Sequence, residues 1–163
     1  GPVRIVVDLT TSAGLHADML AKRGAALLAL AMHLSTDRAV DVQLLVAIGG
    51  RDRRGAPAYI SLIDLPSRQL ELAVACFAMT SAAFPRVLGY GPLMSAGADG
   101  SWSWDISPLD KDSHKAYCQR MRQVLGLSAV DLFVPPAHKD DAMLNNPVAW
   151  LNQRVAEVNG TVE

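Results

Sequence analysis

The chain has 163 residues, of which 50% are apolar and 19% are charged, and its formal net charge is −1. A chain of this size and composition can bury its own core, so we expect residues 3–163 to form one domain, with Gly1 and Pro2 as the remnant of a cleaved tag. Because positive and negative residues are interspersed, the composition argues against an extended basic face for a phosphate backbone. The sequence shows no secretory signal and no apolar run that could span a bilayer, so we expect a cytoplasmic protein without a membrane partner.

Apolar periodicity and turn residues predict four strands and four main helices. The predicted strands cover residues 4–9, 40–48, 58–65 and 129–134. The predicted helices cover residues 17–35, 68–79, 111–125 and 148–158, with Gly126 ending the third and Asn146 capping the last.

Helical spacing also predicts which side chains face the core. In the second helix the apolar stripe contains Leu70, Leu72, Val74 and Phe77, and in the last helix it contains Val148, Leu151, Val155 and Val158. Cys76 and Cys118 lie within helical apolar patterns, which predicts reduced core thiols rather than a disulfide.

The order of these elements predicts an α/β fold. The loop at residues 49–56 is too short for a crossover helix, so the second and third strands are expected to be antiparallel neighbours. A right-handed crossover then places the fourth strand beside the first. The prediction is a three-layer sandwich, with a mostly parallel sheet of about four strands in the order 3-2-1-4 and helices on both faces.

A candidate site begins where the first strand ends. Asp8, Thr10 and Ser12 alternate along the chain, so in an extended segment their side chains face the same way. One carboxylate and two hydroxyl oxygens form a hard ligand set that suits Mg²⁺. The same residues are also common helix caps and turn formers, which is the structural alternative.

The segment that follows the fourth strand, residues 135–141, is expected to lie beside this site. In open parallel sheets, ligands bind outside the carboxyl ends of the strands where the strand order reverses. The predicted crevice therefore collects His16 from the first loop together with His138, Asp140 and Asp141 from the second.

The Asp8-x-Thr10-x-Ser12 motif, the antiparallel third strand and the helix order together resemble a shortened von Willebrand factor A domain. The resemblance implies a metal-ion-dependent adhesion site that holds Mg²⁺. It further implies a loop threonine, for which Thr80 or Ser81 stands in, and an aspartate after the fourth strand. The chain departs from the pattern there, because Pro135 and Pro136 occupy that place and the nearest acid is Asp140.

The function that this reading predicts is a non-catalytic protein-interaction module. The metal ligands would be Asp8, Thr10, Ser12, Thr80 and Asp140, and a carboxylate from a partner protein would complete the coordination sphere. The residues expected to contact the partner are His16, Ser81, His138 and Asp141.

Two other functions are kept as alternatives. The first is a single-stranded nucleic-acid-binding or transcription or replication accessory factor, phage-borne, with Arg51, Arg53 and Arg54 on phosphates and Trp102 and Trp104 stacking on bases. The second is a metal-dependent hydrolase. The sequence contains no Gly-x-Ser-x-Gly elbow, no phosphate-binding Gly-x-x-x-x-Gly-Lys loop and no zinc-type Cys/His spacing, which argues against an enzyme.

Overall fold

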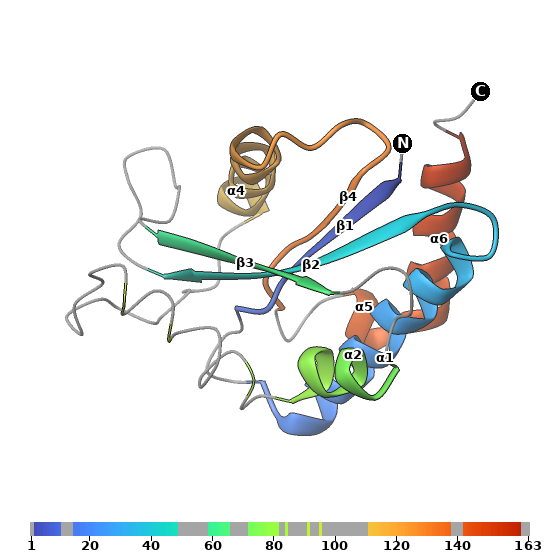
Figure 1. The fold of residues 1–163 in the computed structure, drawn as a ribbon, viewed down its shortest axis with the longest axis horizontal. Helices are drawn as coiled ribbons and strands as arrows, with labels where there is room; N and C mark the ends of the chain where they lie inside the picture. Colours follow the sequence, from blue (N-terminus) through green and yellow to red (C-terminus); the bar gives the residue numbers. More distant parts are fainter. Residues whose placement is uncertain are drawn as a thin grey trace.

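The computed structural model describes residues 2–10, 15–48, 59–65, 72–81, 84, 91, 95, 111–137 and 142–160. In chain order the elements are β1 (Val3–Asp8), α1 (Ala17–Leu34), β2 (Val40–Ile48), β3 (Tyr59–Leu65), α2 (Leu72–Thr80), α4 (Lys111–Val124), β4 (Leu132–Val134), α5 (Ala142–Asn145) and α6 (Pro147–Gly160). Figure 1 shows them in the colours of the sequence.

The sheet has four strands in the order β3-β2-β1-β4, which confirms the predicted order. β1 pairs in parallel with both β2 and β4, so that Val7 lies between Leu44 and Val134. β2 and β3 are antiparallel, as the short connection between them predicts.

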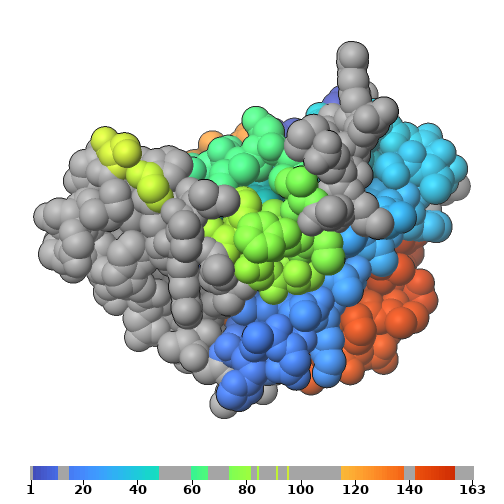
Figure 2. Space-filling model, turned by 60° about the horizontal axis from the view of Figure 1, so that its bottom comes forward, coloured from blue at the N-terminus to red at the C-terminus, as the bar shows by residue number. Residues whose placement is uncertain are grey.

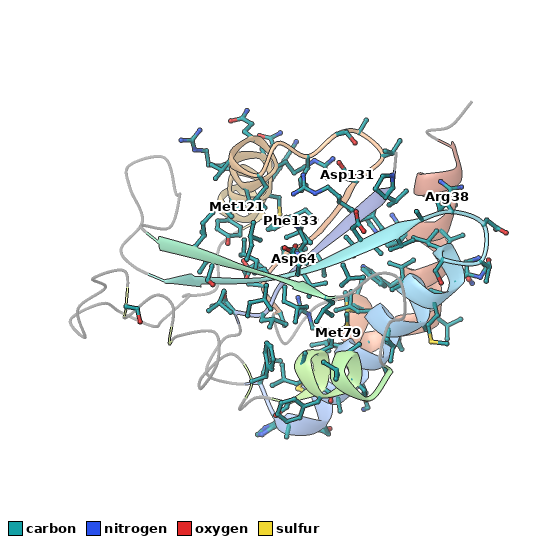
Figure 3. The ribbon with its side chains drawn as sticks, in the orientation of Figure 1. Arg38, Asp64, Met79, Met121, Asp131 and Phe133 are labelled. Carbon is teal, nitrogen blue, oxygen red and sulfur yellow. The ribbon has the colours of Figure 1, made fainter. Side chains whose placement is uncertain are left out.

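Alternation along β1 divides the apolar core between the two faces of the sheet. Ile5 and Val7 belong to a larger cluster with Leu27 and Leu30 of α1. Val6 belongs to a smaller cluster with Met121 of α4. Figure 1 shows α4 on one face and α1, α2, α5 and α6 on the other. Figure 3 places Met121 and Phe133 on the α4 side and Met79 on the opposite side.

The face that α2 buries differs from the predicted one. Ala75, Ala78 and Met79 are buried, whereas Val74 and Phe77 are exposed, Phe77 to 53%. Because α2 carries apolar residues on every side, their spacing does not reveal which side packs against the core. The close approach of α1 decides it, since a Cβ built on Gly24 would lie 2.5 Å from Cγ2 of Thr80. Figure 2 shows α2 directly beside α1 at the surface.

Two more expectations need correction, and one is confirmed. Cys76 is exposed and only Cys118 is half-buried, although both are free as predicted. Val148 is 67% exposed, and Trp150 packs against the core of the larger cluster alongside Leu151 and Val155 of the predicted stripe. The prediction of a cap at Asn146 is confirmed, because its Oδ1 accepts a hydrogen bond from the N–H of Ala149 at 3.1 Å.

The last strand is shorter than predicted, and a short helix follows it. Residues 129–131 form a turn and bend, because Oδ2 of Asp131 accepts hydrogen bonds from the N–H and hydroxyl of Ser128, each at 2.7 Å. α5 lies in a segment for which the sequence pattern predicts no helix. Gly126 follows α4 with a φ of +60°, as its predicted role at the helix end requires.

Among the described helices, none is both long and apolar enough to cross a bilayer.

Candidate functional site at the ends of β1 and β4

The segments that follow β1 and β4 are joined by a backbone hydrogen bond. The N–H of Ala137 donates to the carbonyl oxygen of Thr10 at 3.2 Å. This contact continues the parallel pairing of the two strands beyond their last regular residues. The predicted juxtaposition of the two strand ends is therefore present, and we call this place the strand-end mouth, formed by residues 8–10 and 135–137.

The carboxyl group of Asp8 is fixed in place at the base of the mouth. Its side chain is fully buried, at 0% exposure. Oδ1 accepts hydrogen bonds from the N–H of Thr10 at 2.9 Å and from the Thr10 hydroxyl at 2.5 Å. Oδ2 accepts one from the hydroxyl of Tyr117 of α4 at 2.5 Å. Both carboxyl oxygens are thus engaged by protein groups.

Arg23 of α1 links the two strand ends from the other side. Its side chain is buried, and Nη2 donates to the carbonyl oxygen of Asp8 at 2.9 Å and to that of Pro135 at 2.6 Å. A buried guanidinium that bonds two carbonyls gives the mouth a defined geometry, because a shift of either strand end would leave a buried polar group without its partner.

Burial controls the ionisation of Asp8. Loss of hydration raises the pKa of this carboxyl above its ordinary value of 3.8. The hydrogen bonds from Thr10 and Tyr117 and the charge of Arg23 act in the opposite direction without cancelling the effect of burial. The site therefore holds a carboxyl group whose protonated form is favoured more than in water.

The side chain of Thr10 is also buried, and its hydroxyl is held by Asp8. A hydroxyl that donates its proton keeps its oxygen lone pairs, and the oxygen becomes more electron-rich through the bond to a carboxylate. Thr10 is 7% exposed, whereas Asp8 is completely covered. The described residues contain no group of three or more His, Cys, Asp or Glu side chains placed to hold a metal ion.

The other predicted site residues divide into two groups. Ser12, His138, Asp140 and Asp141 lie outside the described residues, as do Arg51, Arg53, Arg54, Trp102 and Trp104. Three predicted residues are described.

Of these three, His16 is exposed and caps α1 through its carbonyl oxygen, which accepts from the N–H groups of Met19 and Leu20. The Thr80 hydroxyl donates to the carbonyl oxygen of Cys76 at 2.6 Å, within its own helix. Ser81 is half-buried, and its N–H donates to the carbonyl oxygen of Phe77. The structure thus brings Asp8 and Thr10 together and engages Thr80 locally.

Sequence reasoning missed two residues of the mouth, Arg23 and Tyr117. Arg23 carried a usable signal, because it stands at helical spacing before Ala26, Leu27 and Leu30, on the buried side of α1. A charge on an apolar stripe indicates a buried partner. Tyr117 precedes the buried Met121 by one helical turn, which predicts its burial but not its hydrogen bond to Asp8.

Comparison with protein-family models, curated proteins and solved structures finds no match for this chain. The resemblance to a von Willebrand factor A domain therefore stays a prediction from the sequence.

Proposed function

We propose that this chain is a non-catalytic interaction module whose strand-end mouth receives a carboxylate of a partner protein through a divalent cation. The observation that carries the proposal is the hydrogen bond between Ala137 and Thr10, which joins the two strand ends at the point where the strand order reverses. Ligands of open α/β sheets bind at this kind of position.

Within this proposal, Thr10 and Asp8 have different roles. Thr10 would offer its hydroxyl oxygen to Mg²⁺ or Mn²⁺, ions that prefer oxygen ligands. Asp8 would act as a positioning residue, since it holds the Thr10 hydroxyl and N–H from behind. Ser12 and Asp140, which lie outside the described residues, are the further oxygen donors that the sequence predicts. A bound cation would supply a positive charge that attracts the carboxylate of the partner.

The buried hydrogen bonds of the mouth favour recognition over chemistry. Its one described carboxyl group is fully buried and engaged by Thr10 and Tyr117, so it is poorly placed to take a proton from a substrate. Of the three functions that the sequence allows, recognition uses this arrangement most directly. The residues proposed for nucleic-acid binding lie outside the described part of the chain, so no contact among the described residues favours that alternative.

Titration calorimetry with Mn²⁺ on the 163-residue chain tests the proposal. We expect one Mn²⁺ per chain, and we expect Thr10→Val to remove this binding because it keeps the shape of the side chain and deletes the oxygen. Asp8→Asn should weaken the binding of Mn²⁺ by about 10- to 100-fold, which is typical for the loss of a group that orients a metal ligand.

Thr36→Val is the matched control, because Thr36 is an exposed threonine whose hydroxyl bonds the carbonyl oxygen of His33 at the far end of α1. It should bind Mn²⁺ like the wild type. If the wild-type chain takes up no Mn²⁺, or if Thr10→Val binds it equally well, the proposal is wrong.

A further inference from the structure

A cavity of about 370 Å³ lies against the outer edge of β4. Leu132 and Val134 of this strand face the larger core cluster and Phe133 faces the smaller one, yet all three line the cavity. Cys118 of α4 and Trp150 of α6 also line it, from opposite faces of the sheet. A cavity can reach helices on both faces of a sheet only at one of its edges. This cavity therefore lies at the outer edge of β4, which is the last strand in the order β3-β2-β1-β4.

The lining has the chemistry of a small-molecule site. The described lining residues are mostly apolar, namely Leu132, Phe133, Val134, Pro135, Ala142, Met143 and Trp150, with Cys118, Gln153 and Arg154 as the polar members. The volume falls within the range of ligand pockets, which are predominantly apolar and carry a few polar groups.

Arg154 gives the cavity its charge. Its guanidinium lies over the Trp150 ring, 6.0 Å from the ring centroid, within reach of a cation–π contact. Arg154 is also the one charged side chain among the described residues that line the cavity. A planar guanidinium beside an apolar wall matches a carboxylate attached to an apolar body.

We propose that this cavity binds a small apolar carboxylic acid, with the apolar body against Phe133 and Trp150 and the carboxylate on Arg154. The cavity shares Pro135 with the strand-end mouth, but the proposed ligand contacts other residues and does not depend on the function proposed for the mouth. The same chemistry could come from a free acid or from the last residue of a peptide.

A matched series of three probes tests the proposal by calorimetry: 4-phenylbutyrate, 4-phenylbutanol and 4-phenylbutylamine. They share the apolar body and differ in charge. We expect the acid to bind about tenfold more tightly than the alcohol, with the amine weakest, because one charge-assisted pair is worth about a factor of ten or more. Arg154→Gln should abolish the preference for the acid, and Lys22→Gln, an exposed residue of α1, should leave it unchanged.

The two cysteines supply a readout that needs no variant. Cys118 lines the cavity and Cys76 is exposed on α2, so both can be followed in one alkylation experiment by mass spectrometry. We expect 4-phenylbutyrate to slow the alkylation of Cys118 and to leave that of Cys76 unchanged. Equal rates with and without the acid, or equal slowing at both cysteines, would overturn the proposal.

A tetrapeptide that ends in leucine, with a free or an amidated carboxyl terminus, distinguishes the two sources. Tighter binding of the free peptide than of 4-phenylbutyrate identifies a peptide end as the ligand. Tighter binding of 4-phenylbutyrate identifies a free acid. Absence of binding by both acids contradicts the proposed site.

Discussion

The hydroxyl of Tyr117 donates a hydrogen bond of 2.5 Å to Oδ2 of Asp8, although 109 residues separate the two along the chain. This contact ties α4 to the end of β1 across one face of the sheet. Because the carboxyl group is fully buried, the bond gives Oδ2 a partner that water cannot replace without opening the core.

Tyr117→Phe is therefore expected to destabilise the fold by about 1–3 kcal/mol, the cost of leaving a buried acceptor without its donor. Urea unfolding at neutral pH measures this loss of stability. The same substitution in an Asp8→Ala background is the control, since no carboxyl group remains there and the cost should fall by at least about 1 kcal/mol. An equal cost in both backgrounds would show that the hydroxyl acts elsewhere.

The pH dependence of stability should carry the signature of Asp8. Below about pH 3.8, its ordinary pKa, both the folded and the unfolded chain hold the proton. As the pH rises above that value, the unfolded chain ionises first, because the pKa is raised in the folded state. The contribution of Asp8 to the free energy of unfolding thus decreases with rising pH until the raised pKa is passed. Asp8→Asn should remove this decrease.

Asp131 should behave in the opposite way, and it provides the comparison. Burial acts to raise the pKa of Asp131, but hydrogen bonds from the N–H of Arg4 and from Ser128 hold it below 3.8. Its stabilising contribution is complete above pH 3.8 and is lost as the pH falls through the lowered pKa.

Denaturation curves of Asp8→Asn and Asp131→Asn between pH 2 and 8 should differ from the wild type with opposite slopes. Parallel curves for the wild type and Asp8→Asn would show that Asp8 does not titrate as described.

Arg23→Met tests whether the guanidinium fixes the strand-end mouth. It deletes two hydrogen bonds from a charged donor to the carbonyl oxygens of Asp8 and Pro135, and we expect a loss of about 3 kcal/mol in the free energy of unfolding. Lys22→Met is the control, since Lys22 is the exposed neighbour on the same helix. Equal stability of the two variants would show that the guanidinium of Arg23 does not stabilise the strand-end mouth.

Gly24→Ala tests the close approach of α1 and α2. Alanine favours a helix over glycine by about 1 kcal/mol, so a solvent-exposed site would be stabilised. Here the new methyl group would lie 2.5 Å from Cγ2 of Thr80 and 2.7 Å from the carbonyl oxygen of Met79. We therefore expect a net destabilisation of about 1–3 kcal/mol, as for other overpacked cores.

Thr80→Ser removes the obstructing Cγ2 and keeps the hydroxyl that bonds Cys76. In combination with Gly24→Ala it should recover part of the loss in thermal unfolding. Only part returns, because the backbone of Met79 stays close. A stabilised Gly24→Ala variant would mean that the two helices lie farther apart.

The strand order could be predicted because it depends on features that are local in sequence. A short loop after residue 48 requires an antiparallel neighbour, and crossover handedness places β4 beside β1. The orientation of α2 could not be predicted, because a helix with apolar residues on every side has no distinct face. The packing of α2 depends on Gly24, which lies about 50 residues earlier in the chain.

The site was predictable only in part for a similar reason. Asp8 and Thr10 are marked by their place at the end of a buried strand, and their mutual hydrogen bonds follow from a separation of two residues. Tyr117 and Arg23 reach Asp8 from other elements, so only the assembled fold shows that they meet there.

The most direct test of the proposed function is a crystal structure of the chain soaked in Mn²⁺, with anomalous scattering used to locate the ion. We expect a peak about 2.0–2.3 Å from Oγ1 of Thr10, with Asp8 still hydrogen-bonded to Thr10 and Tyr117. A strand-end mouth without a peak, or an ion bound directly by Asp8 after the loss of these hydrogen bonds, would contradict it.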